Sequence, residues 1–267
     1  LNKNDFVLDI ASNDGSLLNF YKQTIKTFGI DPILEKYTDE YKNINYKLAD
    51  FFSARKIKNV TKKKFKIITA LSVFYDAADP NKFIKDVKKL LSQDGVFLLE
   101  FADLASIIQN KMFDTICHEH LEYYSTKVIM NLCKKNNLKI FDIKKNDING
   151  ASKQYYICHK NTNYKINKKK IDNIFKEEKI LKLSEEKTFK NFINSINKSK
   201  NRLYKFLKQK TKLGKKVHGY GASTKGNVLL QYYNISNKMV KFIAERNSKK
   251  YNLYTPGSKI KIISEAL

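Results

Sequence analysis

The sequence predicts an α/β protein built on a mostly parallel sheet with an antiparallel edge, followed by a second, smaller lobe. Two observations lead to this prediction. Nearly all-apolar segments of strand length alternate with helical patterns through the first half of the chain, which is typical of parallel strands covered on both faces. Near residue 215 a second strand, glycine-rich turn and helix begin.

The first strand, turn and helix set the interpretation of the whole chain. Phe6–Ile10 is an apolar run, Ala11–Gly15 is a small polar turn, and Leu17–Tyr21 has apolar residues at helical spacing. Phe28–Asp31 then predicts a second strand that ends on an acid. In a nucleotide-binding βαβ unit, an acid at this place binds the ribose hydroxyls.

The turn differs from a pyrophosphate site, because it holds one glycine and is accompanied by two acids, Asp9 and Asp14. Both carboxylates would repel a pyrophosphate at the helix N-terminus. They suit a ligand with a cationic centre and no phosphate, and S-adenosylmethionine is such a ligand. An ordinary βαβ crossover without a ligand is the alternative.

Three more strands are expected, at Tyr46–Phe52, Phe65–Leu71 and Val96–Phe101. Asp79-Pro80 predicts a helix start between the last two, and Asp94-Gly95 predicts a turn. Asp50 and Phe51 end the first of these strands, where an acid can accept the adenine amino group and a phenylalanine can pack on the ring. The alternative is a strand end with core phenylalanines.

Half of the four histidines lie in one triplet, His118-Glu119-His120. A histidine beside a carboxylate is the arrangement that tunes and orients a general base. Two histidines at this spacing can also bind a metal, but no third ligand has a suggestive spacing, so no metal is expected. Histidines that only form hydrogen bonds in a loop are the remaining alternative.

The second half of the chain begins with an expected antiparallel edge pair, Leu138–Ile143 and Gln154–Cys158. Residues 165–213 are lysine-rich and helical, contain no proline and end at Gly214, which predicts two helices or one broken helix that connects two lobes. The strand-like segment Lys259–Ile263 lies shortly before the last residue, and the chain has no initiator Met, so we expect it to be cut at both ends.

The turn after residue 218 has the opposite charge character to the first one. Residues 219–226 hold three glycines, two hydroxyls and Lys225, without an acid. Such a turn can present backbone N–H groups and a cation to a phosphate. As a dinucleotide fingerprint it is weak, because one extra residue precedes Gly226. Glu245 is a candidate ribose acid, and a simple strand–turn–helix core is the alternative.

Composition excludes several classes of function. The net charge is +26, but 49 of the 52 basic residues are lysines scattered along the chain, and nucleic-acid readers favour arginine. We therefore expect no specific nucleic-acid partner. Three cysteines without pair spacing indicate a reducing cytoplasm, and no apolar run approaches membrane-spanning length.

Three stretches together resemble one family: DIASNDGSLL, TICHEHLEYYS and GYGASTKGNVLL. In this order they are similar to the S-adenosylmethionine-dependent C-methyltransferases that methylate C3 of TDP-4-keto-deoxyhexoses. The resemblance covers essentially the whole chain, and Arg246-Asn247 and Tyr254–Gly257 add to it. The family's N-terminal zinc-binding domain and its final stretch are absent from this sequence, so the resemblance implies no zinc.

The resemblance implies a class I methyltransferase sheet in residues 1–160, a helical connector in 161–213 and an incomplete Rossmann-like nucleotide-sugar lobe in 214–267. It implies a monomer or homodimer with a small-molecule acceptor. The cofactor-binding residues that we expect are Asp9, Ala11, Ser12, Asn13, Gly15, Asp31, Pro32, Asp50, Phe51, Ala70 and Ser72. The acceptor-binding residues that we expect are Cys117, Asn149, Ser152, Gly221, Ser223, Thr224, Lys225 and Asn227. Cys117 departs from the tyrosine that is usual in the family, which leaves the role of that phenol open.

In the implied reaction, a base removes the C3 proton beside the C4 ketone, and the carbanion then attacks the sulfonium methyl group. His120 is the candidate base, Glu119 would orient it, and His118 would polarise the ketone or hold the loop. Three alternatives stay open. They are methylation of another acceptor (a different sugar position, a sugar hydroxyl or RNA), a fragment that binds ligands without turnover, and an NAD-dependent enzyme.

Overall fold

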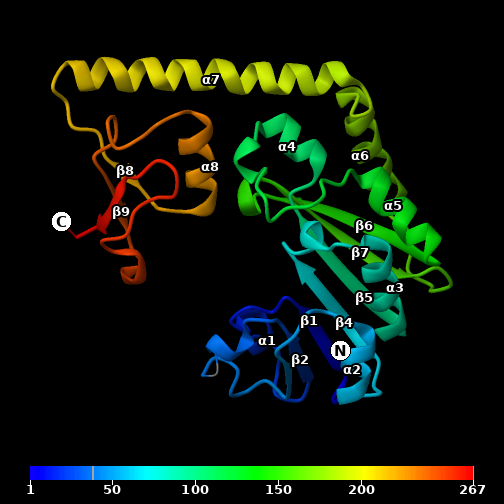
Figure 1. Cartoon of the computed structure of the whole chain (residues 1–267). Helices are drawn as coiled ribbons and strands as arrows, with labels where there is room; N and C mark the ends of the chain where they lie inside the picture. Colours follow the sequence, from blue (N-terminus) through cyan, green and yellow to red (C-terminus); the bar gives the residue numbers. More distant parts are fainter. Residues whose placement is uncertain (38, 267) are drawn as a thin grey trace. The chain divides into compact units, whose positions relative to one another are not determined.

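The computed structural model describes residues 1–37 and 39–266 (Figure 1). Residue contacts group these into two compact units. The first unit comprises Leu1–Ser106 with Leu121–Leu181, and the second comprises Ile107–His120 with Lys182–Leu267. This grouping differs from the sequence-based boundaries at two places: the segment that carries the histidine triplet belongs to the second unit, and the expected connector 161–213 is divided between the units after Leu181.

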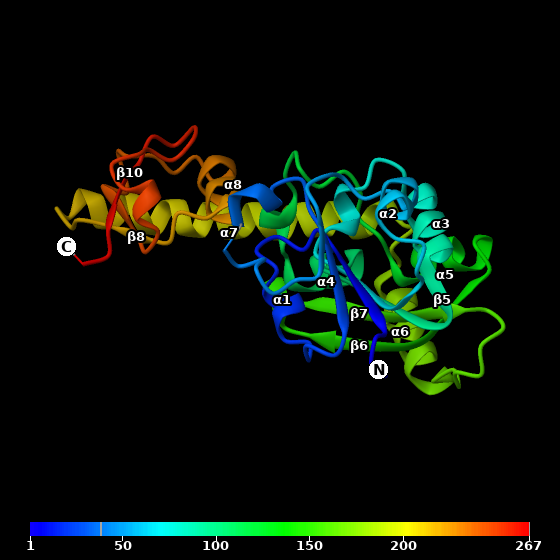
Figure 2. The ribbon, with the colours of Figure 1, turned by 90° about the horizontal axis from the view of Figure 1, so that it is seen from below.

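The first unit is organised around a seven-stranded sheet of order β3-β2-β1-β4-β5-β7-β6. All neighbours pair in parallel except β7, which is antiparallel to both β5 and β6. The predicted mostly parallel sheet with an antiparallel edge is therefore confirmed, and Figure 2 shows β6 and β7 side by side at that edge. The strands are β1 Phe6–Ile10, β2 Lys26–Ile30, β3 Tyr46–Leu48, β4 Phe65–Leu71, β5 Leu91–Phe101, β6 Leu138–Asn146 and β7 Ser152–His159.

Four helices cover one face of this sheet, and Figure 1 shows them following one another along it. They are α2 Ala54–Val60, α3 Pro80–Leu90, α5 Thr126–Lys135 and α6 Lys168–Leu181. Their buried side chains join alternate strand residues such as Leu8 and Ile10 in one core, because successive side chains of a strand point to opposite faces. Helix α3 begins as predicted, since the Asp79 carboxylate accepts the Lys82 N–H and Pro80 is the first helical residue.

The opposite face is covered near β1 and β2 by a smaller cluster that includes Val7, Leu18, Tyr41 and Ile44. Helix α1 spans only Ser16–Asn19, shorter than the predicted segment, and Phe20 is exposed. The predicted turn at Asp94-Gly95 lies inside β5, where the pairing with β4 shifts register between Phe65 and Ile67. The extra residues are accommodated as an irregularity within the strand, so the chain continues without reversing.

The second unit holds the helices α7 Glu186–Lys212 and α8 Thr224–Tyr232. Its three strands, β8 Gly219–Tyr220, β9 Phe242–Glu245 and β10 Lys261–Ser264, form a parallel sheet of order β10-β9-β8. The prediction of two helices in residues 165–213 is confirmed by α6 and α7. Helix α4 Leu104–Asn110 spans the point where the chain passes from one unit to the other. Among the described residues no helix is long and apolar enough to cross a membrane.

Candidate functional site

The carboxyl ends of β1, β2 and β4 meet at one edge of the first sheet, and the predicted cofactor residues of the first unit gather there. The turn after β1 is held tightly: the N–H groups of Ala11 and Ser12 both donate to the Ile30 carbonyl. Ala11 and Asn13 have positive φ values of 56° and 49°, a conformation that non-glycine residues rarely adopt. Strained backbone of this kind clusters at functional sites.

Asp31, directly after β2, is buried and orders this turn. One carboxylate oxygen accepts the Asn13 N–H at 3.0 Å, and the other accepts the Ile33 N–H, beyond Pro32, at 2.9 Å. A carboxylate has about four acceptor positions. Asp31 therefore keeps acceptor capacity on each oxygen, which suits a bidentate contact to the two hydroxyls of a ribose.

Asp9 is a second buried acid at the same edge, and its Oδ1 accepts the hydroxyl of Thr69 at 2.5 Å. The pKa of Asp9 is raised to about 7, mainly by loss of hydration on burial and also by the nearby Asp31, although the Thr69 hydrogen bond lowers it. In residues 1–37 and 39–266, no lysine or arginine forms an ion pair with Asp9 or Asp31. The pair therefore fits a ligand that brings its own positive charge.

Tyr41 is a residue of this site that sequence reasoning missed. It is fully buried, and its hydroxyl donates to Ser12 Oγ at 2.6 Å. Burial, together with the carboxylates of Asp31, Asp9 and Asp14, raises the pKa of Tyr41 to about 12, although the hydrogen bond with Ser12 lowers it.

Two glycines make room for the ring of Tyr41: a Cβ on Gly29 would lie 2.7 Å from its Cε1, and a Cβ on Gly15 would lie 3.0 Å from its Cε2. Gly15 also has a φ of 73°, so the glycine in the predicted turn is needed for both space and backbone conformation.

The predicted adenine residues follow β3. The Asp50 carboxylate accepts the Phe51 N–H and pairs with the Lys56 ammonium at 2.5 Å, and these contacts lower the pKa of Asp50. The Phe51 side chain is 73% exposed. An exposed ring beside an ionised carboxylate can stack on a heterocycle and accept from its amino group.

Ser72, an expected cofactor residue, and Asn149, an expected acceptor residue, are in contact in the first unit. Asn149 Nδ2 donates to Ser72 Oγ at 3.0 Å, and both residues have positive φ values. Ala70 is buried at the end of β4. Ser152 is also buried and donates to the Ile148 carbonyl at 2.9 Å, so its hydroxyl closes the β6–β7 turn.

Glu100, one residue before the end of β5, is a further acid that sequence reasoning missed. It is buried at the carboxyl end of β5, and its Oε2 accepts the side-chain amides of Asn146 and Gln154 at 2.8 and 2.6 Å.

The histidine triplet lies in the part of the second unit formed by Ile107–His120. The His120 N–H donates to the Cys117 carbonyl, which closes a turn, and His118 and Glu119 are exposed. The Nδ1 of half-buried His120 lies 3.5 Å from Thr115 Oγ1, at the long limit of a hydrogen bond. Thr115, which sequence reasoning missed, can thus hold Nδ1 and leave Nε2 as the basic nitrogen. Phe113 anchors the segment by stacking on Tyr233 with ring centroids 5.2 Å apart.

Several backbone N–H groups of the glycine-rich turn in the second unit already donate hydrogen bonds within the protein. Gly221 N–H donates to the Ala244 carbonyl, Ala222 N–H to Glu245 Oε2, and Gly226 N–H to the capping hydroxyl of Ser223. A phosphate at this turn would therefore depend on side chains such as Thr224 and Lys225 more than on the predicted backbone cradle.

Asn227 lies one turn into α8, and its side-chain oxygen is buried without a hydrogen-bond partner. Such an oxygen is a potential acceptor for a ligand.

Glu245 does not have the properties of a ribose acid. Its carboxylate accepts the N–H groups of Ala222, Arg246 and Asn247 and lies 3.5 Å from the Lys250 ammonium. The hydrogen bonds from Asn247 and Ala222 are the main reason why the pKa of Glu245 falls to about 2. Its acceptor positions are filled by the protein itself, which disfavours NAD as the ligand of this lobe.

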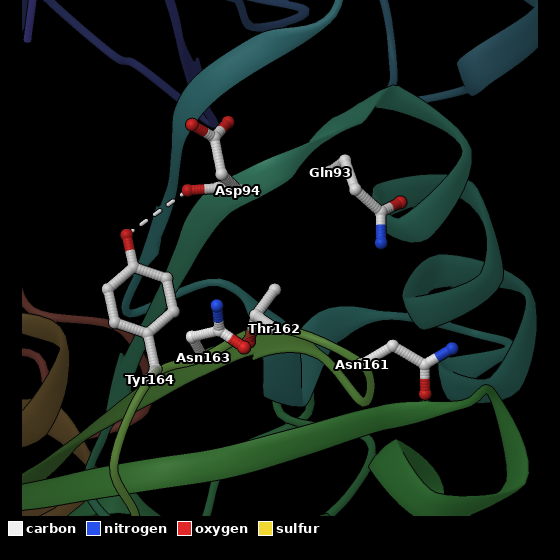
Figure 3. A pocket seen from close by; sticks show the side chains of 6 residues that line it. All are labelled: Gln93, Asp94, Asn161, Thr162, Asn163 and Tyr164. Atoms are coloured by element: carbon white, nitrogen blue, oxygen red, sulfur yellow. Dashed lines mark hydrogen bonds between the residues drawn. The ribbon is translucent and has the colours of Figure 1, made fainter.

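A shallow polar pocket lies at the opposite end of the first sheet, where β5 begins and the chain leaves β7 (Figure 3). Asp94 and Tyr164 are among its lining residues, and the Tyr164 hydroxyl donates to the Asp94 carbonyl at 3.1 Å. Ligands of open α/β sheets bind at the carboxyl ends of the strands, so this pocket is not part of the candidate site. Among the described residues no three histidine, cysteine or acidic side chains gather as metal ligands.

Comparison with known proteins finds two family models that match successive parts of the chain. Residues 1–143 match the family model described as a methyltransferase domain, and residues 147–267 match that of a C-methyltransferase C-terminal domain. The chain is 24% identical to C-methyltransferase NovU of Streptomyces niveus over 267 residues, which is 99% of this chain and 63% of NovU. A tRNA U34 carboxymethyltransferase of Campylobacter jejuni is 28% identical over 57% of this chain and 56% of its own length.

Two solved structures are similar in fold, each with a TM-score of 0.46. An S-adenosylmethionine-dependent methyltransferase from Clostridium acetobutylicum has a TM-score of 0.46 at 15% identity, over 58% of this chain and 84% of that one. PKMT2 from Rickettsia typhi in complex with AdoHcy has a TM-score of 0.46 at 16% identity, over 65% of this chain and 53% of that one. The methyltransferase-domain match supports the predicted cofactor, S-adenosylmethionine, and the chain belongs to the methyltransferase-domain family.

Proposed function

We propose that this chain carries out S-adenosylmethionine-dependent methylation of a carbon atom, C3, in a nucleotide-linked 4-keto-deoxysugar. The observation that carries the proposal is the buried pair of acids, Asp9 and Asp31, at the carboxyl edge of the first sheet without a cation of their own. The likeness to C-methyltransferase NovU over nearly the whole chain supports carbon as the methyl acceptor.

Residues of the first unit would hold the cofactor. Asp31 would bind the ribose hydroxyls with its remaining acceptor positions, the Ala11–Gly15 turn would face the methionine part, and Asp50 with Phe51 would hold the adenine. When bound, S-adenosylmethionine supplies an electrophilic methyl group on a positively charged sulfur. Ionised Asp9 would favour that positive charge at this edge.

His120 would act as the general base. A proton on C3 beside the C4 ketone is weakly acidic, and its removal by Nε2 leaves the electron pair in an enolate. Thr115 Oγ1 lies near Nδ1 and would keep the proton on that nitrogen. General base catalysis of this kind contributes roughly two to four orders of magnitude in rate. Glu119 would stabilise the imidazolium, and His118 would polarise the ketone.

The nucleotide part would bind to the second unit. Its diphosphate would contact Lys225 and the hydroxyls of Ser223 and Thr224 at the start of α8, where the helix dipole favours negative charge. Asn227 Oδ1, buried and unpartnered, would accept from the ligand. Cys117 would face the sugar where the family usually has a tyrosine. The described cysteines are all free thiols, which supports a cytoplasmic protein.

The test has a binding arm and a chemical arm. Calorimetry with S-adenosylhomocysteine should show micromolar binding, and NAD should not bind. Methyl transfer from labelled S-adenosylmethionine to a TDP-4-keto-deoxyhexose is then followed together with solvent exchange of the C3 proton. Binding of NAD alone would show that the first unit has been misassigned.

His120→Ala tests the base directly. We expect both C3 exchange and methyl transfer to be lost, with S-adenosylhomocysteine affinity within a few-fold of wild type. His218→Ala, which changes a histidine outside the triplet, is the matched control and should keep both reactions. Retained C3 exchange in His120→Ala would rule His120 out as the base.

RNA as the methyl acceptor is the second candidate, and the net charge of +26 is the observation that favours it. A tRNA-modifying relative is similar over part of the chain. Binding of RNA that weakens steeply with salt, with no competition from sugar nucleotides, would support this acceptor. Salt-independent competition by the sugar nucleotide would exclude it.

A further inference from the structure

Lys153 is a buried lysine in β7 that the proposed reaction does not use. Its side chain is 3% exposed, and its ammonium lies 2.6 Å from Asp103 Oδ2 and 3.2 Å from Glu178 Oε1, whose side chains are 0% and 7% exposed. The same ammonium donates to Thr126 Oγ1 at 3.3 Å. Taking three charges out of water is costly, and apolar replacements of such groups are often equally stable. Stability alone therefore does not account for this cluster.

Each carboxylate of the cluster also caps the N-terminus of a helix. Asp103 Oδ1 accepts the hydroxyl of Ser106 at 2.5 Å and its N–H at 3.3 Å, at the start of α4. Glu178, which reaches across from α6, accepts the Thr126 N–H at 2.8 Å, at the start of α5. Carboxylates are favourable at helix N-termini, where N–H groups lack helical partners. Lys153 thus connects the cap of α4 to the cap of α5.

These two helix starts lie on either side of the segment that carries the histidine triplet. The chain leaves the first unit after Ser106 and returns to it at Leu121. Within the first unit the two ends are also tied by backbone: the Leu104 N–H donates to the Tyr124 carbonyl at 2.9 Å, and the Leu121 N–H donates to the Tyr75 carbonyl at 2.9 Å. The Lys153 cluster therefore lies where the chain departs and where it re-enters.

We propose that Lys153, with Asp103 and Glu178, is a positioning device for the His118–His120 segment. The Lys153 ammonium holds the N-terminal caps of α4 and α5 together. It thereby fixes the positions at which the chain enters and leaves the segment that carries His118–His120. Hydrogen bonds and ion pairs have directions that apolar contacts lack, so the cluster specifies one arrangement of these ends. The expected effect of the cluster on kcat rests on the proposed function. Its expected effect on the order of the residues that flank the segment does not.

The experiment compares wild type with Lys153→Met and with the charge-free triple variant Asp103→Asn, Lys153→Met, Glu178→Gln. Because Lys153→Met alone leaves two carboxylates buried without their cation, it can fail to fold. The triple variant keeps amide oxygens that can cap both helices but removes the connection between them. Asp86→Asn is the matched control, since Asp86 is a buried carboxylate that caps a different helix through the Ala54 N–H.

Amide hydrogen exchange is the readout that does not depend on catalysis. In the triple variant we expect exchange to quicken at least tenfold at residues 104–106 and 121–128, with β1 and β4 unchanged. We also expect kcat to fall at least tenfold, with S-adenosylhomocysteine affinity within threefold of wild type. Asp86→Asn should show none of these effects.

Three results would overturn the proposal: wild-type exchange at both chain ends, faster exchange spread evenly over the first unit, or an unchanged kcat beside locally faster exchange. If wild type itself transfers no methyl group to a keto-sugar, the proposed function fails, and the exchange pattern still decides whether the cluster holds the chain ends.

Discussion

The raised pKa of Asp9 makes a prediction about stability that can be tested without any substrate. The native protein releases this proton at about pH 7, whereas an unfolded aspartate has a pKa of 3.8. Between these values the native state binds a proton that the unfolded chain has lost, so the free energy of unfolding must fall as pH rises. The stability that protonated Asp9 contributes is fully present below the unfolded pKa of 3.8 and is lost as the pH rises through the folded pKa of about 7.

The magnitude follows from the same pKa. Each pKa unit corresponds to about 1.4 kcal/mol. Raising the pH from 5 to 8 should therefore lower the free energy of unfolding by about 3 kcal/mol through Asp9 alone, since its native pKa is about 7. Asp9→Asn removes the titration but keeps an oxygen that can accept from Thr69. We expect this variant to lack that part of the pH dependence.

Urea unfolding of the ligand-free protein at pH 5 and pH 8 measures the effect. The control is Asp39→Asn, which changes a carboxylate whose side chain is 81% exposed and should leave the wild-type pH dependence in place. If Asp9→Asn loses as much stability between pH 5 and pH 8 as wild type, the argument from burial is wrong. The same substitution should weaken S-adenosylmethionine binding at pH 8. It removes the negative charge of the Asp9 carboxylate, which costs the folded protein stability but favours the positively charged sulfur of the ligand.

Other predictions concern the same edge of the sheet. Asp31→Ala should weaken S-adenosylhomocysteine binding by about 1–3 kcal/mol in calorimetry, and unchanged affinity would contradict the ribose assignment. Tyr41→Phe should lower the free energy of urea unfolding by about 1 kcal/mol through the lost bond to Ser12, and an unchanged value would show that this bond contributes nothing. Gly29→Ala should lower the free energy of unfolding by about 1–3 kcal/mol, because the new Cβ would lie 2.7 Å from the Tyr41 ring. Thermal unfolding measures the effect, and an unfolding temperature equal to that of wild type would refute the close packing.

Much of the first unit could be predicted because its signals are local. Mainly apolar segments of strand length mark β1 and β4, and the Asp79-Pro80 pair marks the start of α3. Local sequence signals gave wrong predictions where tertiary contacts determine the length of a helix or the path of a strand. Phe20 has helical spacing but is exposed, so it gives α1 no reason to continue. Asp94-Gly95 has turn chemistry, but β5 pairs with β4 on both sides of it and keeps the chain extended.

The candidate site shows the same division. Asp31 was found because it ends a predicted strand, and Asp9 was found because it accompanies the turn after the first predicted strand. Glu245 also ends a strand, yet its carboxylate accepts the N–H of Ala222, a residue 23 positions away that only the fold brings to it. The histidine triplet could be identified from the amino-acid sequence alone. Its assignment to the second unit, however, follows from tertiary packing such as that of Phe113 on Tyr233.

The sequence by itself determined the parallel sheet, its antiparallel edge, the acid after β2 and the histidine triplet, because side-chain periodicity and turn chemistry act over a few residues. Only the tertiary structure decided the pKa of Asp9, the contact of Tyr41 with Ser12 and the Lys153 cluster. Tyr41 lies 29 residues from Ser12, and Lys153 lies 50 residues from Asp103. Burial and hydrogen bonding at such separations depend on how the elements pack, and no local pattern encodes that packing.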